Sequence, residues 1–182
     1  MEEMNGVRDE ILAIIRKFPD FPKQGIVFCD IMPLMKHPQL MTRLCQGIAK
    51  HYDGKVDAVA GLEARGFLFG PQVAQLLNVP FTPIRKKGKL PGPVISAGYV
   101  KEYGVDIVEI QSDALNPGAR VLVIDDLLAT GGTLKAALDL IRQARAFPVE
   151  SFALIELECL NGRGIVGSET NVESLIKIPD VS

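Results

Sequence analysis

Residues Val121 to Leu134, VLVIDDLLATGGTL, decide the fold of this 182-residue chain. Four apolar residues that suit a buried strand lead into the pair Asp125 and Asp126, and a turn of small residues follows from Ala129 to Thr133. Apolar side chains then recur at helical spacing, which predicts a helix from Leu134 to Arg145. A strand, a loop and a helix in this order are typical of a parallel α/β sheet, in which ligands bind outside the carboxyl ends of the strands.

The loop after this strand combines two kinds of binding group. The first turn of a helix has backbone N–H groups without intrahelical partners, and it attracts anions. Gly131 and Gly132 let the backbone approach a phosphate closely, and the hydroxyls of Thr130 and Thr133 add donors. The Asp pair would repel a phosphate but suits vicinal hydroxyls, such as those of a ribose. The stretch therefore favours a site for a sugar phosphate.

Another interpretation of the same stretch is a magnesium site of a receiver or phosphatase-like domain, because an apolar strand there also ends in carboxylates. The stretch does not match two common nucleotide-binding motifs. It has neither the GK[ST] of a P-loop nor the GxGxxG of a dinucleotide-binding fold.

Composition indicates one ordinary globular domain. The chain is 47% hydrophobic and 23% charged, with a formal net charge of -2, so neither a nucleic acid nor a membrane surface is expected as a partner. Three scattered cysteines indicate reduced thiols. We find no signal-peptide pattern and no apolar run near the ~18 residues that span a membrane, so we expect a cytoplasmic protein.

The rest of the chain alternates predicted helices and strands, which favours an α/β fold with a mainly parallel sheet. The loop from Glu63 to Gly66 and the cationic loop from Arg85 to Pro93 also follow predicted strands, so three strand ends suit anions. Tyr99 to Ile110 suggests an exposed β-ribbon, and everything after Leu157 reads as rich in loops. The other predicted elements are helices at 7–18, 38–52 and 67–77 and strands at 56–62, 81–84 and 151–157.

Five segments together resemble the adenine-specific members of the type I phosphoribosyltransferase family. They are FPDFPKQGIVF, AGLEARGFLFGP, IRKKGKLPGP, EYG and VLVIDDLLATGGT, in the family's order and spacing. The resemblance implies that family's fold, a mainly parallel central sheet flanked by helices, with an N-terminal hood and a mobile β-ribbon loop. It implies a single domain over 1–182, in which 1–35 form the N-terminal helix and base-binding arm and 86–104 the mobile active-site loop.

The activity implied by this resemblance is Mg²⁺-dependent transfer of a phosphoribosyl group from 5-phosphoribosyl-1-pyrophosphate (PRPP) to adenine. The products would be AMP and pyrophosphate, as in purine salvage, and the metal would arrive bound to PRPP with no protein ligand assigned. The resemblance also implies a homodimer in which Arg85 reaches the neighbouring site.

The resemblance also assigns roles to residues. Glu102 would be the general acid/base on the mobile loop, beside Tyr103, and Asp125 and Asp126 would hold the ribose hydroxyls. The 5′-phosphate would bind Ala129, Thr130, Gly131, Gly132 and Thr133. Pyrophosphate would bind Ala64, Arg65, Gly66, Arg85, Lys86 and Lys89, and the Ala64 loop would contain a non-proline cis peptide. Adenine would contact Val27, Cys29 and Leu127.

One position departs from the family's pattern, because many members carry Arg where this chain has Cys29. If backbone groups read the adenine edge there, Cys can take its place; if the Arg side chain closes the pocket, it cannot. Two other functions stay open at this point: transfer to another purine such as hypoxanthine or xanthine, and a PRPP-sensing regulator without catalysis.

Overall fold

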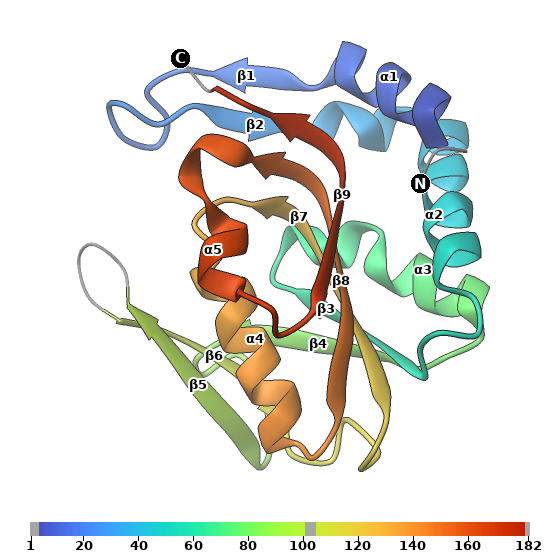
Figure 1. Ribbon diagram of the computed structural model, residues 1–182, viewed down its shortest axis with the longest axis vertical. Coiled ribbons are helices and arrows are strands. Elements are labelled where there is room, and N and C mark those ends of the chain that lie inside the picture. Colours follow the sequence, from blue (N-terminus) through green and yellow to red (C-terminus); the bar gives the residue numbers. More distant parts are fainter. Residues whose placement is uncertain (1–3, 101–104, 181–182) are drawn as a thin grey trace.

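The computed structural model describes residues 4–100 and 105–180 (Figure 1). Its centre is a seven-stranded sheet in the order β5-β6-β4-β3-β7-β8-β9. The five strands from β4 to β9 in this order are parallel, whereas β5 and β6 are antiparallel to each other and β6 is antiparallel to β4. The expected α/β architecture with a mainly parallel sheet is confirmed.

The strands of this sheet are β3 (Ala58–Leu62), β4 (Phe81–Lys86), β5 (Val94–Val100), β6 (Val105–Gln111), β7 (Arg120–Leu128), β8 (Phe147–Leu157) and β9 (Asn171–Ile178). A separate antiparallel pair consists of β1 (Arg16–Phe18) and β2 (Phe28–Asp30). The α-helices are α1 (Asn5–Ile14), α2 (Pro38–Tyr52), α3 (Gly70–Leu77), α4 (Gly132–Gln143) and α5 (Gly162–Val166). Short 3₁₀ turns are η2 (Met32–Lys36), η3 (Arg65–Leu68) and η4 (Glu158–Leu160).

The sheet separates two hydrophobic cores. One contains the apolar faces of α1, α2 and α3, including the fully buried Leu44 and Ile48. The other contains the inner face of α4, where Leu138 and Ile141 are fully buried as the spacing predicts. Figure 1 shows α2 and α3 on one side of the sheet and α4 and α5 on the other.

The loops that follow β3 and β7 create a crevice between them. From β3 the chain turns through η3 to α3 on one face, and from the neighbouring β7 it turns to α4 on the opposite face. The two loops therefore diverge at the carboxyl ends of adjacent parallel strands. In open α/β sheets such a switch point is where ligands bind.

The N-terminal region forms the hood seen at the top of Figure 1. The prediction of a helix over 7–18 was wrong for residues 15–18, because the helix ends at Ile14 and Arg16–Phe18 is a strand. That strand pairs with Phe28–Asp30, and the Arg16 side chain donates to Asp30 across the pair. Tertiary pairing therefore overrides the local helical spacing at this point.

The prediction of a loop-rich C-terminus was also wrong. Residues 171–178 form β9, an edge strand paired in parallel with β8, and 162–166 form the short helix α5. The sequence of β9, NVESLIKI, mixes charged and apolar residues because the strand lies at the edge of the sheet. The predicted ribbon over 99–110 is two longer strands, β5 and β6.

The remaining predicted elements differ mainly at their ends. The helix from Pro38 to Tyr52 has the expected bounds. The helix expected over 67–77 is instead a 3₁₀ turn followed by α3. The central helix begins at Gly132, two residues earlier than expected, so the glycine pair lies at its amino end.

Candidate active site

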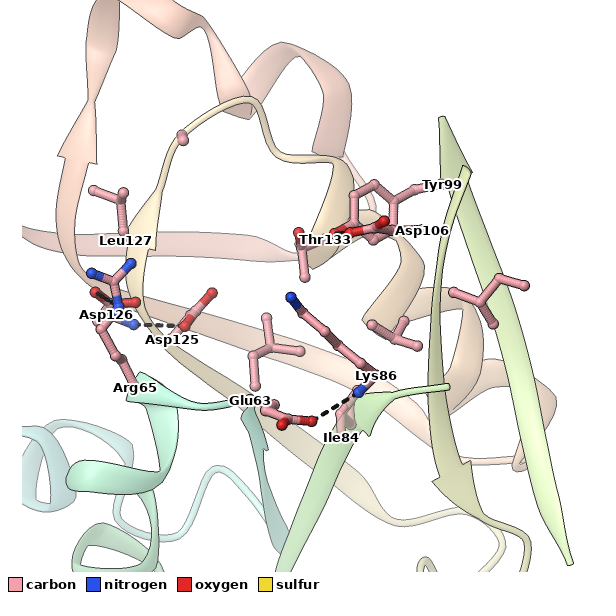
Figure 2. A pocket seen from close by; sticks show the side chains of 14 residues that line it. Glu63, Arg65, Ile84, Lys86, Tyr99, Asp106, Asp125, Asp126, Leu127 and Thr133 are labelled. Carbon is pink, nitrogen blue, oxygen red and sulfur yellow. Dashed lines mark hydrogen bonds and ion pairs between the residues drawn. The ribbon is translucent and has the colours of Figure 1, made fainter. Parts of the chain in front are cut away.

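A cavity of about 270 Å³ occupies the crevice at the switch point. Its lining comes from the ends of β3, β4 and β7, from the β5–β6 ribbon and from the start of α4. Figure 2 shows Asp125, Lys86 and Thr133 pointing into this space, with Glu63 and Arg65 at its edge. In the parallel register Gly61 lies opposite Ile124, so the loop after β3 lies beside the Asp pair.

The two aspartates are held differently. Asp126 is 3% exposed, and its Oδ2 lies 2.9 Å from Nε of the half-buried Arg65, which makes an ion pair between the two loops. Asp125 accepts a hydrogen bond of 2.9 Å from the backbone N–H of Asp126. Burial, and then repulsion by Asp126, raises the pKa of Asp125. Burial also raises the pKa of Asp126, against the opposing charge of Arg65. The pair is a costly concentration of negative charge, which indicates a binding role.

The phosphate loop, residues Ala129–Thr133, joins β7 to α4. Gly131 caps α4 with φ at +82°, a left-handed conformation that a residue with a side chain rarely adopts. The first N–H groups of α4, which lack intrahelical partners, lie at this loop. A smaller adjoining cavity of about 70 Å³ is lined by Ala129, Thr130, Gly131 and Thr133. Four of the five residues that the resemblance assigned to the 5′-phosphate therefore surround one space, and Gly132 lines neither cavity.

The basic loop after β4, residues Arg85–Pro93, is tied to the loop after β3 by Glu63. The guanidinium of Arg85 donates to Glu63 at 3.2 and 3.1 Å, and the backbone N–H of Lys86 donates to the same carboxylate at 2.9 Å. Arg85 also donates to the carbonyl of Lys89 at 3.0 Å. The sequence interpretation did not assign a role to Glu63, although it is the carboxylate of the same strand-end loop.

Ala64, Arg65 and Gly66 follow Glu63 directly. The peptide bond between Glu63 and Ala64 is cis, as the family resemblance implied. Among the described residues, the buried Nη1 of Arg65 has no hydrogen-bond partner. This nitrogen is a donor available to a ligand in the crevice.

Tyr99 and Asp106 of the ribbon complete the lining of the larger cavity. The hydroxyl of Tyr99 donates to Asp106 at 3.2 Å, and Figure 2 shows this pair beside Thr133. The sequence interpretation missed both residues, because an exposed ribbon has no strand-end signal. Glu102 and Tyr103, the expected acid/base and its neighbour, lie outside the described residues.

The side of the site toward the hood is apolar. Val27 and Phe28 are half-buried and Cys29 is 2% exposed. The guanidinium carbon of Arg65 lies 4.9 Å from the centre of the Phe28 ring, which links the hood to the crevice. Leu127 lines both cavities. Burial raises the pKa of the Cys29 thiol, against the opposing charges of Lys17 and Arg65.

Within residues 4–100 and 105–180, no group of three or more His, Cys, Asp or Glu side chains is arranged to hold a metal ion. In the same part of the chain, no helix is long and apolar enough to cross a membrane.

Comparison with known proteins identifies relatives along the whole chain. A profile of the phosphoribosyl transferase domain matches residues 33–174. Adenine phosphoribosyltransferase of Caenorhabditis elegans is 58% identical, over 100% of this chain and 94% of its own. The solved structure of adenine phosphoribosyltransferase from Thermoanaerobacter pseudethanolicus has a TM-score of 0.90 at 44% identity, covering 94% of this chain and 99% of that chain.

A third relative was solved with ligands. The Saccharomyces cerevisiae adenine phosphoribosyltransferase, complexed with adenine and an imino-altritol 1,6-bisphosphate, has a TM-score of 0.89 at 39% identity and covers 93% of this chain and 98% of that chain. The chain therefore belongs to the phosphoribosyltransferase family, in its adenine phosphoribosyltransferase branch, whose members transfer a phosphoribosyl group to adenine.

Proposed function

We propose that the crevice between the loops of β3 and β7 is where this chain transfers the phosphoribosyl group of PRPP to adenine, with release of pyrophosphate and AMP. The observation that carries the proposal is the meeting of a carboxylate pair and a glycine-rich helix start on β7 with a half-buried cation, Arg65, on the β3 loop. These three features match the diol, the 5′-phosphate and the pyrophosphate of one substrate. The yeast relative's complex with adenine and a sugar-like bisphosphate supports the same assignment.

The phosphate loop would hold the 5′-phosphate. Its backbone N–H groups lie at the amino end of the 12-residue helix α4, where the helix dipole favours an anion. Thr130 and Thr133 would add hydroxyl donors, and Ala129, Gly131 and Gly132 would leave room for the phosphate. Asp125 and Asp126 would accept hydrogen bonds from the ribose hydroxyls.

Arg65 and the basic loop would bind the pyrophosphate, together with the backbone of Ala64 and Gly66. The unpartnered Nη1 of Arg65 is one donor, and the ammonium of Lys86 points into the crevice in Figure 2. Lys89 and Arg85 would supply further positive charge. We further propose a homodimer in which Arg85 serves the neighbouring site, which requires Arg85 to leave Glu63.

The reaction joins adenine N9 to the anomeric carbon of the ribose while the bond from that carbon to the pyrophosphate oxygen breaks. Positive charge builds on the ribose and negative charge on the leaving group, and groups already positioned for these charges lower the barrier. Asp125 and Asp126 lie on the ribose side and Arg65 on the pyrophosphate side. A Mg²⁺ ion carried by PRPP would neutralise pyrophosphate oxygens, and Asp125 offers the carboxylate oxygen that this ion prefers as a ligand.

Adenine would react as the tautomer that carries its proton on N7, which leaves the N9 lone pair free to form the new bond, and Glu102 is the proposed base that accepts the N7 proton. Tyr103 would accompany it on the loop 86–104, whose closure would exclude water from the cationic ribose. Adenine would lie between Val27 and Leu127, with backbone groups near Cys29 reading its edge.

The three free cysteines agree with our expectation of a cytoplasmic protein.

A nucleobase panel tests this function. The purified protein, PRPP and Mg²⁺ are incubated separately with adenine, hypoxanthine, xanthine and guanine, and nucleotide and pyrophosphate are measured. We expect the incubation with adenine to give AMP and pyrophosphate in equal amounts, and the other three bases to give no product. Comparable turnover of an oxopurine would contradict adenine specificity, and PRPP binding without product would indicate a regulator.

The role of Glu102 is tested by Glu102→Gln. Loss of a positioned acid/base group lowers the rate by a factor on the order of 10²–10⁴. We expect the single-turnover rate to fall by this factor while the Kd for PRPP stays within about 3-fold. An unchanged single-turnover rate would contradict the assignment.

A further inference from the structure

An ion pair with a buried carboxylate lies behind the phosphate loop and lines neither cavity of the site. Glu156 on β8 is 4% exposed. Arg163 on α5 donates from Nε and Nη2 to its two carboxylate oxygens, at 2.6 and 2.7 Å. On β9, the Ser174 hydroxyl donates to the same carboxylate, and the Val172 carbonyl accepts a further hydrogen bond from Arg163. One guanidinium thus joins β8, α5 and β9.

Helix α5 begins at a turn that touches the phosphate loop. Asn161 precedes it in the left-handed conformation, with φ at +49°, and Gly162 is its first residue. A Cβ on Gly131 would lie 2.4 Å from the carbonyl oxygen of Gly162, and a Cβ on Gly162 would lie 2.4 Å from the carbonyl oxygen of Ala129. The two backbones are therefore in direct contact, with no side chain between them.

We infer that the pair Glu156 and Arg163 positions the phosphate loop for PRPP, acting through the backbone contact of Gly162 with Ala129 and Gly131. This inference rests on the proposed function, in which the phosphate loop binds the 5′-phosphate. It gives the segment 158–174 a part in substrate binding, although that segment contributes no side chain to the two cavities.

The length of α5 explains why an ion pair is needed. A helix of five residues has little stability of its own, because helix formation depends on packing when the helix is short. The fully buried Val166 anchors its carboxyl end, and Arg163 fixes its first turn to the sheet. Burial disfavours the charged form of Glu156, but hydrogen bonds from Arg163 and Ser174 hold its pKa below the ordinary value. The carboxylate is therefore charged and bound at neutral pH.

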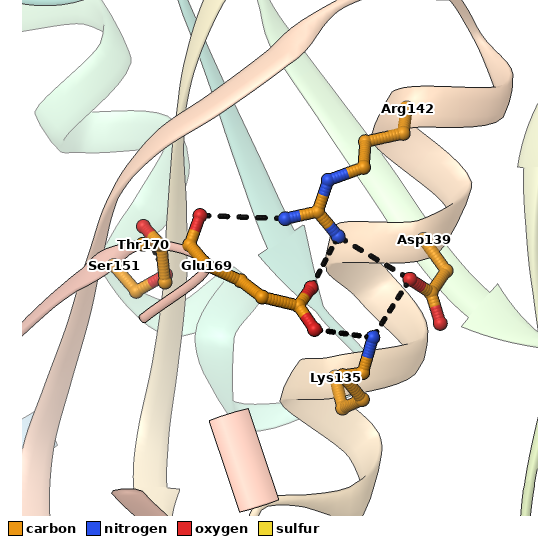
Figure 3. A network of polar contacts seen from close by, with 6 residues as sticks. All are labelled: Lys135, Asp139, Arg142, Ser151, Glu169 and Thr170. Atoms are coloured by element: carbon orange, nitrogen blue, oxygen red, sulfur yellow. Dashed lines mark hydrogen bonds and ion pairs between the residues drawn. The ribbon is translucent and has the colours of Figure 1, made fainter. Parts of the chain in front are cut away.

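A second tie joins the same segment to α4, as Figure 3 shows. Glu169 pairs with Lys135 at 2.6 Å and also with Arg142, and Asp139 contacts both cations. All four side chains are between 32% and 41% exposed. The Glu156 carboxylate is buried and receives two hydrogen bonds from Arg163, which is adjacent to Gly162, so this pair is the stronger constraint on the turn at Gly162.

The test compares Arg163→Ala with Arg120→Ala. Arg120 makes the same kind of forked pair, with Asp57 at 3.0 and 2.8 Å, and its side chain is 45% exposed against 40% for Arg163. It lies at the first residue of β7, at the opposite end of that strand from the phosphate loop. We expect Arg163→Ala to raise the KM for PRPP and the Kd for ribose 5-phosphate about 10-fold, with the KM for adenine within about 2-fold. Arg120→Ala should leave all three within about 2-fold.

Two further variants keep the test decisive. If Arg163→Ala does not fold, Arg163→Lys keeps the charge but loses the forked geometry, and it should raise the same two constants. Gly162→Ala disturbs the backbone contact directly and should also raise the KM for PRPP and the Kd for ribose 5-phosphate. A general loss of stability would change the constants for PRPP and for adenine alike. Unchanged PRPP and ribose 5-phosphate constants in folded Arg163 and Gly162 variants would overturn the inference.

One more variant distinguishes failure of this inference from failure of the proposed function. Thr133→Val removes a hydroxyl of the phosphate loop itself and should raise the KM for PRPP. If Thr133→Val has this effect and the Arg163 variants do not, the inference alone is wrong. If neither has it, the assignment of the 5′-phosphate to this loop is wrong.

Discussion

The two sides of the crevice that we propose to bind anions are built in opposite ways. The phosphate loop offers backbone N–H groups and hydroxyls, and its backbone lies against that of Gly162. The opposite side offers charged side chains, and these are already paired: Arg65 with Asp126 and Arg85 with Glu63. A phosphate can enter the first side without breaking an ion pair. A pyrophosphate on the second side competes with carboxylates for the cations.

This difference suits the reaction. The 5′-phosphate stays bound from substrate to product, so a rigid site serves both. Pyrophosphate must be held while it leaves and must then be released, and in the proposed site the carboxylates that take back the arginines would favour its release. The backbone side should therefore be sensitive to shape, and the side-chain side should be sensitive to charge.

The largest expected effect comes from shape. Gly131→Ala places a methyl group 2.4 Å from the Gly162 carbonyl oxygen at a φ of +82°. Left-handed strain costs about 1–3 kcal/mol, and the clash adds to it. We expect kcat/KM for PRPP to fall by at least about 100-fold in steady-state kinetics.

The matched control for this variant lies in the basic loop. Gly88 has a similar φ of +77°, but within the described chain no atom lies within 4 Å of a Cβ built there. Gly88→Ala should lower kcat/KM by less than about 10-fold. Equal losses in both variants would show that strain, and not the contact with Gly162, accounts for the effect.

The next effect separates activity from stability. Asp125→Asn keeps the acceptor for the Asp126 N–H but removes a buried charge. A hydrogen bond to a charged group contributes about 1.5–3 kcal/mol, so kcat/KM for PRPP should fall roughly 10- to 100-fold. The same change relieves repulsion by Asp126, so the variant should melt at a higher temperature at pH 7. A gain of 1 kcal/mol corresponds to roughly 2–4 °C in a chain of this size.

The sign of this stability effect depends on pH. Because the pKa of Asp125 is raised, the folded chain holds that proton more tightly than the unfolded chain does. The wild-type carboxyl is therefore tolerated best below its ordinary pKa of about 3.9 and becomes destabilising as the pH rises through the folded value. The difference in Tm between variant and wild type should grow from pH 4 to pH 8. A constant difference would contradict the raised pKa.

The sequence was sufficient to predict the helices and strands whose hydrophobic pattern runs over many consecutive residues. The run VLVI and the apolar face of α4 are local, so β7, α4 and the phosphate loop between them were found before the structure. The hood strands β1 and β2 have three residues each and exist because they pair with each other, which no local pattern records. Likewise, the pairs of Arg65 with Asp126 and Arg163 with Glu156 depend on which strands are neighbours.

A smaller effect is expected on the side-chain side of the crevice. Glu63→Gln keeps an acceptor for the Lys86 N–H but removes the charge that pairs with Arg85, whose side chain is 34% exposed. Because such pairs contribute about 0.2–1 kcal/mol, we expect pyrophosphate to bind 2- to 5-fold more tightly and to be released more slowly. Product-inhibition kinetics measures this change. Weaker pyrophosphate binding would show that Glu63 positions Arg85 and does not compete for it.

The smallest effect is expected at Cys29, which belongs to neither side of the crevice. Its side chain is 2% exposed and lies in the hood core, on the strand that carries Phe28 toward Arg65. If backbone groups read the adenine edge here, Cys29→Ala removes no donor or acceptor that adenine uses. The KM for adenine should then change by less than about 3-fold, and the KM for PRPP should not change. Steady-state kinetics with both substrates, beside Cys45→Ala as a second buried thiol, measures this. A rise of about 100-fold in the KM for adenine alone, equivalent to about 2.8 kcal/mol, would show that the thiol itself contributes to binding of the base.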